Sequence, residues 1–165
     1  MLTIKSVTSE TKNLAEIQRL YEDAFPKNER HPLRNLLTTP NSPAETMALY
    51  DGELFCGFAV LLNGRDISHI IYFAIEESLR GKGYGSAALQ VLHEYKTGRR
   101  IMVDIELESP SAPNNEQRRK RKQFYLRNGY AMTSIQYRWQ REDYEILAYG
   151  GDISEEEYDD FWEQL

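Results

Sequence analysis

The hydrophobic pattern is clearest between Ile70 and Tyr95. Residues 70–75 are almost wholly apolar and rich in β-branched and aromatic types, which predicts a strand buried on both faces. From Tyr84 onward, apolar residues recur at helical spacing, which predicts an amphipathic helix. Glycines occupy positions 81, 83 and 85 between these two segments. The stretch therefore predicts a strand, a glycine-rich turn and a helix.

The remaining pattern predicts elements on both sides of this unit. Asn13 and Glu16 have the spacing of a capping box, and Asp51-Gly52 and Asn63-Gly64 are strong hairpin signals. No repeat or linker interrupts the chain, so residues 1–165 are interpreted as a single domain. The expected strands lie at 2–7, 46–50, 53–62, 67–75, 100–107, 130–139 and 144–149, and the helices at 14–25, 33–38, 84–95, 116–127 and 154–165.

Composition narrows the class of protein. The chain has 165 residues, 41% of them hydrophobic and 28% charged, as in one globular domain. No apolar run approaches the ~20 residues of a membrane span, and the start is unlike a signal peptide. The single cysteine, Cys56, excludes an internal disulfide and indicates a reducing, cytoplasmic setting. We therefore expect a cytoplasmic protein without a membrane partner.

Charge is unevenly distributed. The net charge is −6, yet residues 116–127 hold six Lys or Arg and one acidic residue. An acidic body disfavours nucleic-acid binding and modestly favours cationic substrates. Three interpretations of the basic run 118–122 stay open, in this order: a solvated helix face, attraction to phosphates, and a nucleic-acid or localisation patch.

The glycine-rich turn has a physical use. Glycines let the backbone take positive φ and approach a ligand closely, and a helix that begins there directs N–H groups into the turn. Arg80 and Lys82 add positive charge, so the turn suits a pyrophosphate. The order of residues in this turn matches neither a Walker loop nor the dinucleotide-binding fingerprint. A plain tight turn is the alternative.

Two motifs carry a family resemblance. Arg80-x-x-Gly83-x-Gly85 resembles the acyl-CoA pyrophosphate loop of the GNAT superfamily of N-acetyltransferases, of the small bacterial type. The segment from Phe124 to Tyr130 is similar to the second motif of that family. The resemblance extends to about Tyr149 and implies an α/β fold with a mixed sheet, in the order β-α-α-β-β-β-α-β-α-β-β, to which this chain adds a C-terminal helix.

The resemblance also implies acetyl-CoA as cofactor and assigns residues to it. The main chain of Phe73, Ala74 and Ile75 would bond the pantetheine arm, although their side chains equally suit an ordinary core. Tyr125 would protonate the leaving thiolate and contact the cofactor. The pyrophosphate would be held by Arg80, Gly81, Lys82, Gly83, Tyr84, Gly85 and Ser86.

The general base is less constrained. A protonated amine must lose a proton before attack, and Glu106 is the leading candidate, with His69 second. Asp104 and Glu108 are interpreted as solvated edge charges. Where many relatives carry an asparagine that contacts the cofactor, this chain has Arg118, so Asn115 (or its neighbour) is the candidate for that role.

Several further expectations follow. Cys56 lies mid-strand, so we expect direct transfer in a ternary complex and no acetyl-enzyme. Three scattered histidines predict no metal site. Tyr137, Trp139 and Tyr149, with the loop 25–31, would shape a pocket for a small-molecule amine. Alternatively these aromatics are core and the surface of a homodimer.

Three other functions stay open. The acceptor could be a peptide N-terminus or a protein lysine. The chain could be an inactive acetyl-CoA-binding regulatory module, or the loop could hold another nucleotide in an unrelated fold.

Overall fold

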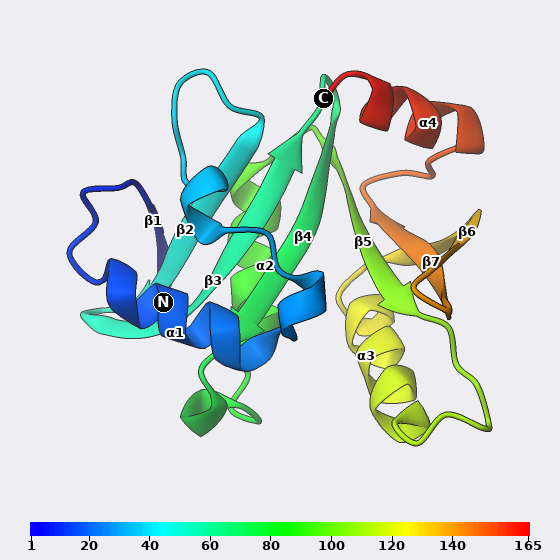
Figure 1. The fold of residues 1–165 in the computed structure, drawn as a ribbon, viewed down its shortest axis with the longest axis horizontal. Coiled ribbons are helices and arrows are strands. Elements are labelled where there is room, and N and C mark those ends of the chain that lie inside the picture. Colours follow the sequence, from blue (N-terminus) through cyan, green and yellow to red (C-terminus); the bar gives the residue numbers. More distant parts are fainter. The chain divides into compact units, whose positions relative to one another are not determined.

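The computed structural model describes all 165 residues and divides the chain into two compact units. The first contains residues 1–63 and 70–95, and the second contains residues 64–69 and 96–165. Figure 1 shows the elements in sequence colours. The prediction of a single domain stays a prediction. None of the helices combines the length and apolar character needed to cross a membrane.

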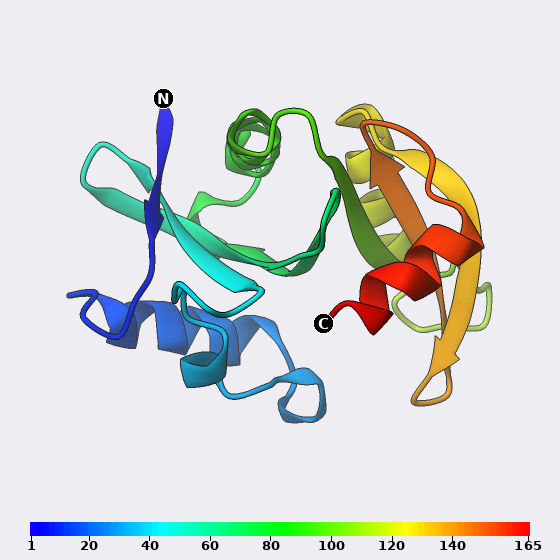
Figure 2. The ribbon, with the colours of Figure 1, turned by 90° about the horizontal axis from the view of Figure 1, so that it is seen from above.

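The first unit is a sheet with helices on both faces. Its strands lie in the order β1-β2-β3-β4, and β1–β2 and β2–β3 pair antiparallel. Seen from above, α1 and α2 lie on opposite faces of these strands (Figure 2). The bounds are β1 Leu2–Ser6, α1 Leu14–Ala24, β2 Ala44–Asp51, β3 Leu54–Asn63, β4 Ile67–Ile75 and α2 Tyr84–Tyr95, with three-residue 3-10 turns at Lys27–Glu29, Leu33–Asn35 and Glu77–Leu79.

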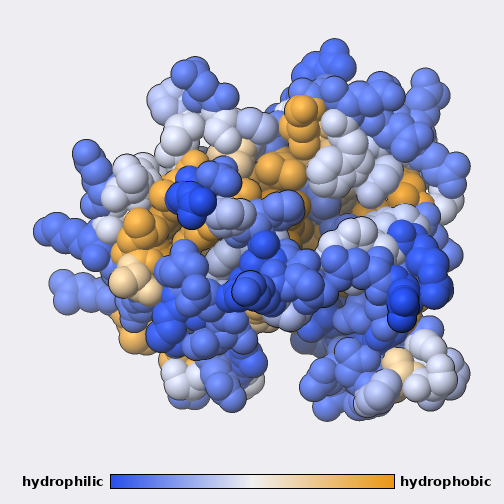
Figure 3. All heavy atoms as spheres, viewed as in Figure 1, coloured by the Kyte–Doolittle hydropathy of each residue, from blue (hydrophilic) through white to orange (hydrophobic).

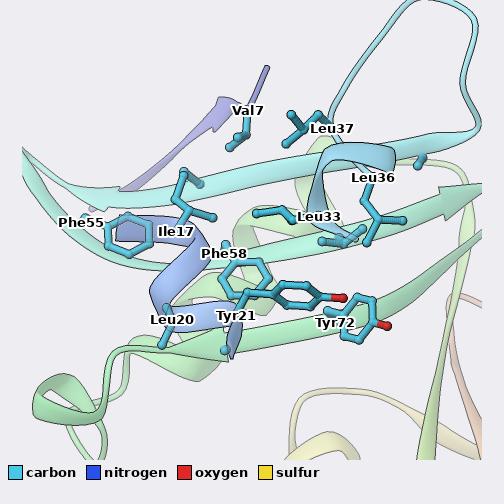
Figure 4. Close-up of a cluster of buried hydrophobic side chains, with 14 residues drawn as sticks. Val7, Ile17, Leu20, Tyr21, Leu33, Leu36, Leu37, Phe55, Phe58 and Tyr72 are labelled. Atoms are coloured by element: carbon cyan, nitrogen blue, oxygen red, sulfur yellow. The ribbon is translucent and has the colours of Figure 1, made fainter. Parts of the chain in front are cut away.

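The main core of this unit lies between α1 and the sheet (Figure 4). Ile17 and Tyr21 point from α1 toward Phe58 of β3, and all three are nearly completely buried. The Tyr21 ring meets those of Phe58 and Tyr72 edge-on, at centroid distances of 5.9 and 4.9 Å. Such contacts add to the area term of burial.

The second unit contains an antiparallel group in the order β5-β7-β6, with Ile101 opposite Tyr149 and Glu106 opposite Tyr144. Helix α3 contacts β5, and α4 contacts β6. The bounds are β5 Arg100–Glu106, α3 Asn115–Arg127, β6 Ala131–Trp139, β7 Glu142–Tyr149 and α4 Glu155–Glu163.

Helix α4 is fastened to the segment that leads into β4. Ser154 and Glu157 form the expected capping box, with reciprocal bonds of 3.1 Å. A Cβ at Gly64 would lie only 2.8 Å from the Phe161 ring, so glycine permits close approach there. The Arg65 N–H donates to the Gln164 side chain at 2.9 Å. The last helix is therefore an integral part of the second unit.

Two local expectations were wrong. Asn13 makes no cap bond to the helix backbone, because its side-chain oxygen accepts a hydrogen bond from the Tyr50 hydroxyl at 2.9 Å. The helix expected at 33–38 is a three-residue 3-10 turn after Pro32. The connection expected at Asn63-Gly64 is present and joins the neighbouring strands β3 and β4, although Gly64, unlike Gly52 (φ 64°), does not take a positive φ.

We predict that Ile17→Ala lowers the free energy of unfolding by about 2–5 kcal/mol, because it opens a cavity in a closely packed cluster. Glu22→Ala, on the exposed face of the same helix, should change it by less than about 0.5 kcal/mol. Urea unfolding measures both. Similar losses for the two variants would contradict the placement of this core.

Candidate active site

The glycine-rich loop joins β4 to α2 in the first unit. Gly81 and Gly83 have φ values of +76° and +86°, and an added Cβ at either would meet nothing within 4 Å. The loop backbone therefore faces open space in a conformation that other residues rarely adopt. α2 begins at Tyr84, directly after the loop, and a helix does not use the N–H groups of its first turn. This geometry fits a pyrophosphate group.

Three contacts fix the loop to its unit. The Arg80 Nε donates to the Ile75 carbonyl at 3.3 Å, and the Tyr84 hydroxyl donates to Asp51 at 2.7 Å. Asp51 raises the pKa of Tyr84 through this bond. The Arg19 guanidinium meets Glu76 at 2.6 Å. The side chain of Tyr84 thus anchors the start of α2.

The strand residues before the loop are packed. Ile75 is buried, and Phe73 packs against the cluster between the sheet and α2. Their side chains belong to the core, which is the alternative that the sequence left open. Their main-chain groups are the ones that remain to contact a pantetheine arm. The loop and the strand end together fit the phosphate and amide groups of an acyl-CoA.

Tyr125 lies on α3 in the second unit and is 8% exposed. Its ring packs at 5.2 Å from both Phe124 and Tyr130. No hydrogen bond within the unit engages its hydroxyl. Burial raises the pKa of Tyr125 to about 12, although the nearby Arg121 cation opposes the rise. The phenol is therefore protonated at neutral pH and can donate.

Glu106 is held by arginines. Its carboxylate meets the Arg118 guanidinium at 2.8 Å and lies 3.9 Å from Arg121. Arg118 is 6% exposed and also reaches Glu142 at 3.2 Å, the Leu107 carbonyl at 3.0 Å and the Asn114 side chain at 2.9 Å. Two guanidinium groups thus occupy the Glu106 carboxylate.

Asn115 and the basic run 118–122 both belong to α3, but their contacts differ. The Asn115 side-chain oxygen accepts a hydrogen bond from the Ser109 N–H at 2.7 Å, which closes the loop before α3. The basic run is not uniformly solvated: besides Arg118, Lys122 turns inward to the buried Glu145 at 3.0 Å. Lys120 and Arg121 remain exposed, in a region where hydrophilic side chains gather over α3 (Figure 3).

His69 meets Asp104 in the interior of the second unit. Its Nε2 is hydrogen-bonded to Asp104 Oδ1, and the Tyr137 hydroxyl donates to Asp104 Oδ2. The His69 side chain is 3% exposed and that of Asp104 is 23% exposed. His69 Nδ1 is buried and has no hydrogen-bond partner. The expectation that Asp104 is a solvated edge charge was wrong, because two side chains cover it.

The position of His69 is fixed by Arg99. This guanidinium donates to the carbonyls of Gly64, Arg65 (2.8 Å) and Ile67 (3.1 Å) and to the Ser68 hydroxyl (3.0 Å). One side chain thereby binds four acceptors along the segment that precedes His69. The Arg99 side chain therefore ties this segment to the start of β5.

Electrostatics set the protonation of this cluster. Burial alone would raise the pKa of Asp104, but the His69 ring and the hydrogen bonds from His69 and Tyr137 outweigh it and lower the pKa below its ordinary value. Burial and the Asp104 charge raise the pKa of Tyr137. Asp104 is therefore an ionised acceptor, and Tyr137 is a neutral donor.

Aromatic rings pack against the two partners of this carboxylate. The Tyr137 ring stacks on that of Tyr144 at 5.2 Å, and the His69 ring meets those of Phe161 and Trp162 edge-on at 5.9 and 5.4 Å. Of the other aromatics named from the sequence, Trp139 flanks Tyr144, while Tyr149 packs against Tyr130. Only Tyr137 contacts Asp104.

Sequence reasoning missed Asp104 and Arg118. Asp104 interrupts an apolar strand, and that interruption was the available signal. Arg118 replaces an expected asparagine within a run of basic residues, and nothing in the run distinguishes a buried guanidinium from exposed ones.

We predict that Arg118→Ala lowers the free energy of unfolding by about 3–5 kcal/mol, because it leaves the largely buried Glu106 carboxylate without its main cation. Arg118→Lys should recover only part of this loss, since an ammonium cannot bond four separate acceptors in fixed directions. Arg119→Ala removes an exposed pair with Glu116 and should cost less than about 0.5 kcal/mol. Denaturant unfolding of the three variants measures this order.

One protein family and several solved structures resemble this chain over most of its length. The model of the acetyltransferase (GNAT) family matches residues 14–130. A solved protein of this family from Bacteroides thetaiotaomicron is 22% identical, with a TM-score of 0.80 over 96% of this chain and 92% of its own. An aminoglycoside 6′-N-acetyltransferase complexed with coenzyme A is 14% identical, with a TM-score of 0.68 over 88% of this chain and 95% of its own.

The ribosomal-protein-S18-alanine N-acetyltransferase of Escherichia coli is 18% identical, with a TM-score of 0.61 over 94% of this chain and 97% of its own. A comparison with curated protein sequences gives no match. At these identities the solved structures establish the fold, which confirms the expected fold class. They also accord with acetyl-CoA as the cofactor, since one was solved with coenzyme A. The family match covers more than half of the chain and confirms the expected enzyme class: the chain belongs to the GNAT family of acetyltransferases.

Proposed function

We propose that this protein transfers an acetyl group from acetyl-CoA to a primary amine of a small molecule, by direct attack in a ternary complex. When bound, acetyl-CoA supplies the thioester that the amine attacks. The loop from Arg80 to Ser86 binds the pyrophosphate through its backbone and charges, and the main chain of Phe73–Ile75 binds the pantetheine arm. The positive φ values of Gly81 and Gly83 support this assignment.

The observation that carries the choice of substrate is the environment of Asp104. This carboxylate is ionised, is partly exposed, and has no lysine or arginine partner, and its partner Tyr137 stacks on the ring of Tyr144. Such a site attracts a compact ammonium group through charge and cation–π interaction. The ammonium group of a small amine would neutralise this carboxylate and would need no contacts elsewhere on the substrate. One solved relative is an aminoglycoside 6′-N-acetyltransferase.

Two side chains handle protons in this proposal. His69 accepts the proton that the ammonium must lose, and Tyr125 donates a proton to the sulfur of the leaving thiolate. The arginine contacts of Glu106 favour His69 over Glu106 as the base. Cys56 is buried, and its burial raises the pKa of the thiol, which supports transfer without an acetyl-enzyme.

A peptide or protein amine is the second candidate acceptor, since one solved relative is an N-acetyltransferase of a ribosomal protein. A protein that binds acetyl-CoA without turnover is the third candidate.

The first experiment separates these functions. Thermal shift with acetyl-CoA, CoA, ATP and NAD tests binding through mass action. Thiol release with spermidine, kanamycin and an N-terminal alanine peptide tests turnover.

We expect stabilisation by acetyl-CoA and CoA alone, and thiol release with the small amines. Release with the peptide only would select the second candidate. Stabilisation with release for none of the acceptors would leave the binding module. Absence of stabilisation by acetyl-CoA would overturn the proposal.

We predict that Gly83→Ala raises the Kd for acetyl-CoA about tenfold or more, which corresponds to the loss of one or two backbone hydrogen bonds. Gly98→Ala is a matched control, because Gly98 has nearly the same φ (+85°) and equally open surroundings in another turn. Both variants should lose about 1–2 kcal/mol of stability from strain. Equal affinities in the two variants would contradict the role of the loop.

We predict that Tyr125→Phe lowers kcat about 10²-fold or more, with little change in the KM for acetyl-CoA, because it removes a proton donor from the leaving group. The hydroxyl makes no hydrogen bond within its unit, so the fold should persist. Tyr130→Phe, a neighbouring buried tyrosine, serves as control for activity. A kcat unchanged by the first substitution would exclude Tyr125 as the donor.

A further inference from the structure

Strand β3 departs from regular sheet geometry beside the end of β4. The pairing between β2 and β3 shifts after Leu49 and Gly57, and the shift leaves Cys56 as an extra residue in β3. Such a bulge bends a strand and redirects the groups next to it. The Cys56 carbonyl accepts a hydrogen bond from the Glu76 N–H at 2.8 Å. The bulge therefore contacts the main chain at the point where β4 ends.

Gly57 follows the bulge and lies against the last peptide groups of β4. A Cβ added to Gly57 would lie 2.2 Å from the Ala74 carbonyl oxygen and 3.0 Å from the Ile75 Cα. All three of the nearest atoms belong to the backbone, which cannot move aside as a flexible side chain can. The φ of Gly57 is not positive, so the position requires a missing side chain and not the conformational freedom of glycine.

This close approach shows how the peptide group between Ala74 and Ile75 is turned. Its carbonyl oxygen lies 2.2 Å from the Cβ position of Gly57 and its carbonyl carbon lies 3.1 Å from it, so the C=O bond points toward β3. The chain contains no cis peptide bond, and in a planar trans peptide the C=O and N–H bonds point in opposite directions. The Ile75 N–H therefore points away from β3.

The next peptide group is turned in the complementary way. Because the Glu76 N–H donates to Cys56 of β3, the Ile75 carbonyl in the same peptide group points away from β3. That carbonyl accepts the hydrogen bond from Arg80 Nε at 3.3 Å. Both main-chain groups of Ile75 thus face the side on which an arginine of the glycine-rich loop reaches the strand.

We propose that Gly57 is a positioning residue for the cofactor: the space left by its missing Cβ lets the Ala74 carbonyl turn toward β3, which directs the Ile75 N–H toward the pantetheine arm of acetyl-CoA. This inference rests on the proposed function, in which the main chain of Phe73–Ile75 binds that arm. A methyl group on Gly57 would displace the Ala74 carbonyl by about 1 Å, and a misplacement of this size strongly weakens an oriented contact.

Calorimetric titration with CoA, followed in parallel by amide NMR, tests the inference. The signals of Gly81 and Gly83 report on the loop, and the signal of Ile75 reports on the strand end. We expect all three signals to shift when CoA binds to the wild type. Gly57→Ala should raise the Kd for CoA about tenfold or more, as for the loss of one or two backbone hydrogen bonds. At saturating CoA it should lose the shift of the Ile75 signal and keep the shifts of the loop.

Gly64→Ala is the matched control. The φ of Gly64 is also not positive, and its added Cβ would lie 2.8 Å from the Phe161 ring, so this variant introduces a steric contact in the second unit instead. It should keep the CoA affinity and all three shifts. A Gly57→Ala protein with the CoA affinity of the wild type would overturn the inference. So would one in which the loop and Ile75 signals lose their shifts together, because that result indicates general damage to the fold.

If Gly57→Ala does not fold, the wild-type titration still tests the inference. Binding that shifts the loop signals but leaves the Ile75 signal unchanged would overturn it, while the loop assignment would stand. Absence of CoA binding would overturn both the inference and the proposed function. Binding with the expected shifts, but without thiol release from acetyl-CoA with spermidine or kanamycin, would contradict the proposed transfer and support the role of Gly57.

Discussion

Charge compensation along β5 is the constraint on which the second unit depends. Asp104 and Glu106 project from the same side of one strand, and both are largely removed from water. An uncompensated buried charge costs several kcal/mol, so each carboxylate needs partners. Glu106 has a buried guanidinium, and Asp104 has an imidazole and a phenol. Two similar residues thus acquire different chemistry from their neighbours.

This difference separates a network of paired charges from a network of proton donors and acceptors. The Arg118 guanidinium connects the end of β5, the loop before α3 and the β6–β7 hairpin, and it contributes the positive charge of every one of these contacts. The Asp104 network contains only groups that can donate or receive protons. Stabilisation by a permanent cation and control of a titratable ring therefore occur two residues apart. A strand is well suited to this, since its backbone fixes both side chains in direction.

The sequence predicted the order of the strands and of the four α-helices, and the glycine-rich turn between β4 and α2, because each depends on local periodicity or on residues close in the chain. It failed where distant side chains compete. The Asn13 capping box is local, yet Tyr50 takes its oxygen. The local sequence around Asp104 predicts a solvated carboxylate, but His69 and Tyr137 bind it in the folded protein. Arg118 looks like its basic neighbours until β5 and β7 supply carboxylates. These outcomes depend on tertiary contacts that no local pattern encodes.

The attachment of α4 has a consequence for the time course of folding. The hydrogen bond between Arg65 and Gln164 closes a sequence separation of 99 residues, and Phe161 of the same helix packs beside His69. Contacts between such distant segments form slowly, because chain entropy must be lost before they form. The hydrophobic shell of the imidazole is thus among the last parts of the molecule to assemble. A newly made chain can complete this shell only once residues 161–164 have joined the fold.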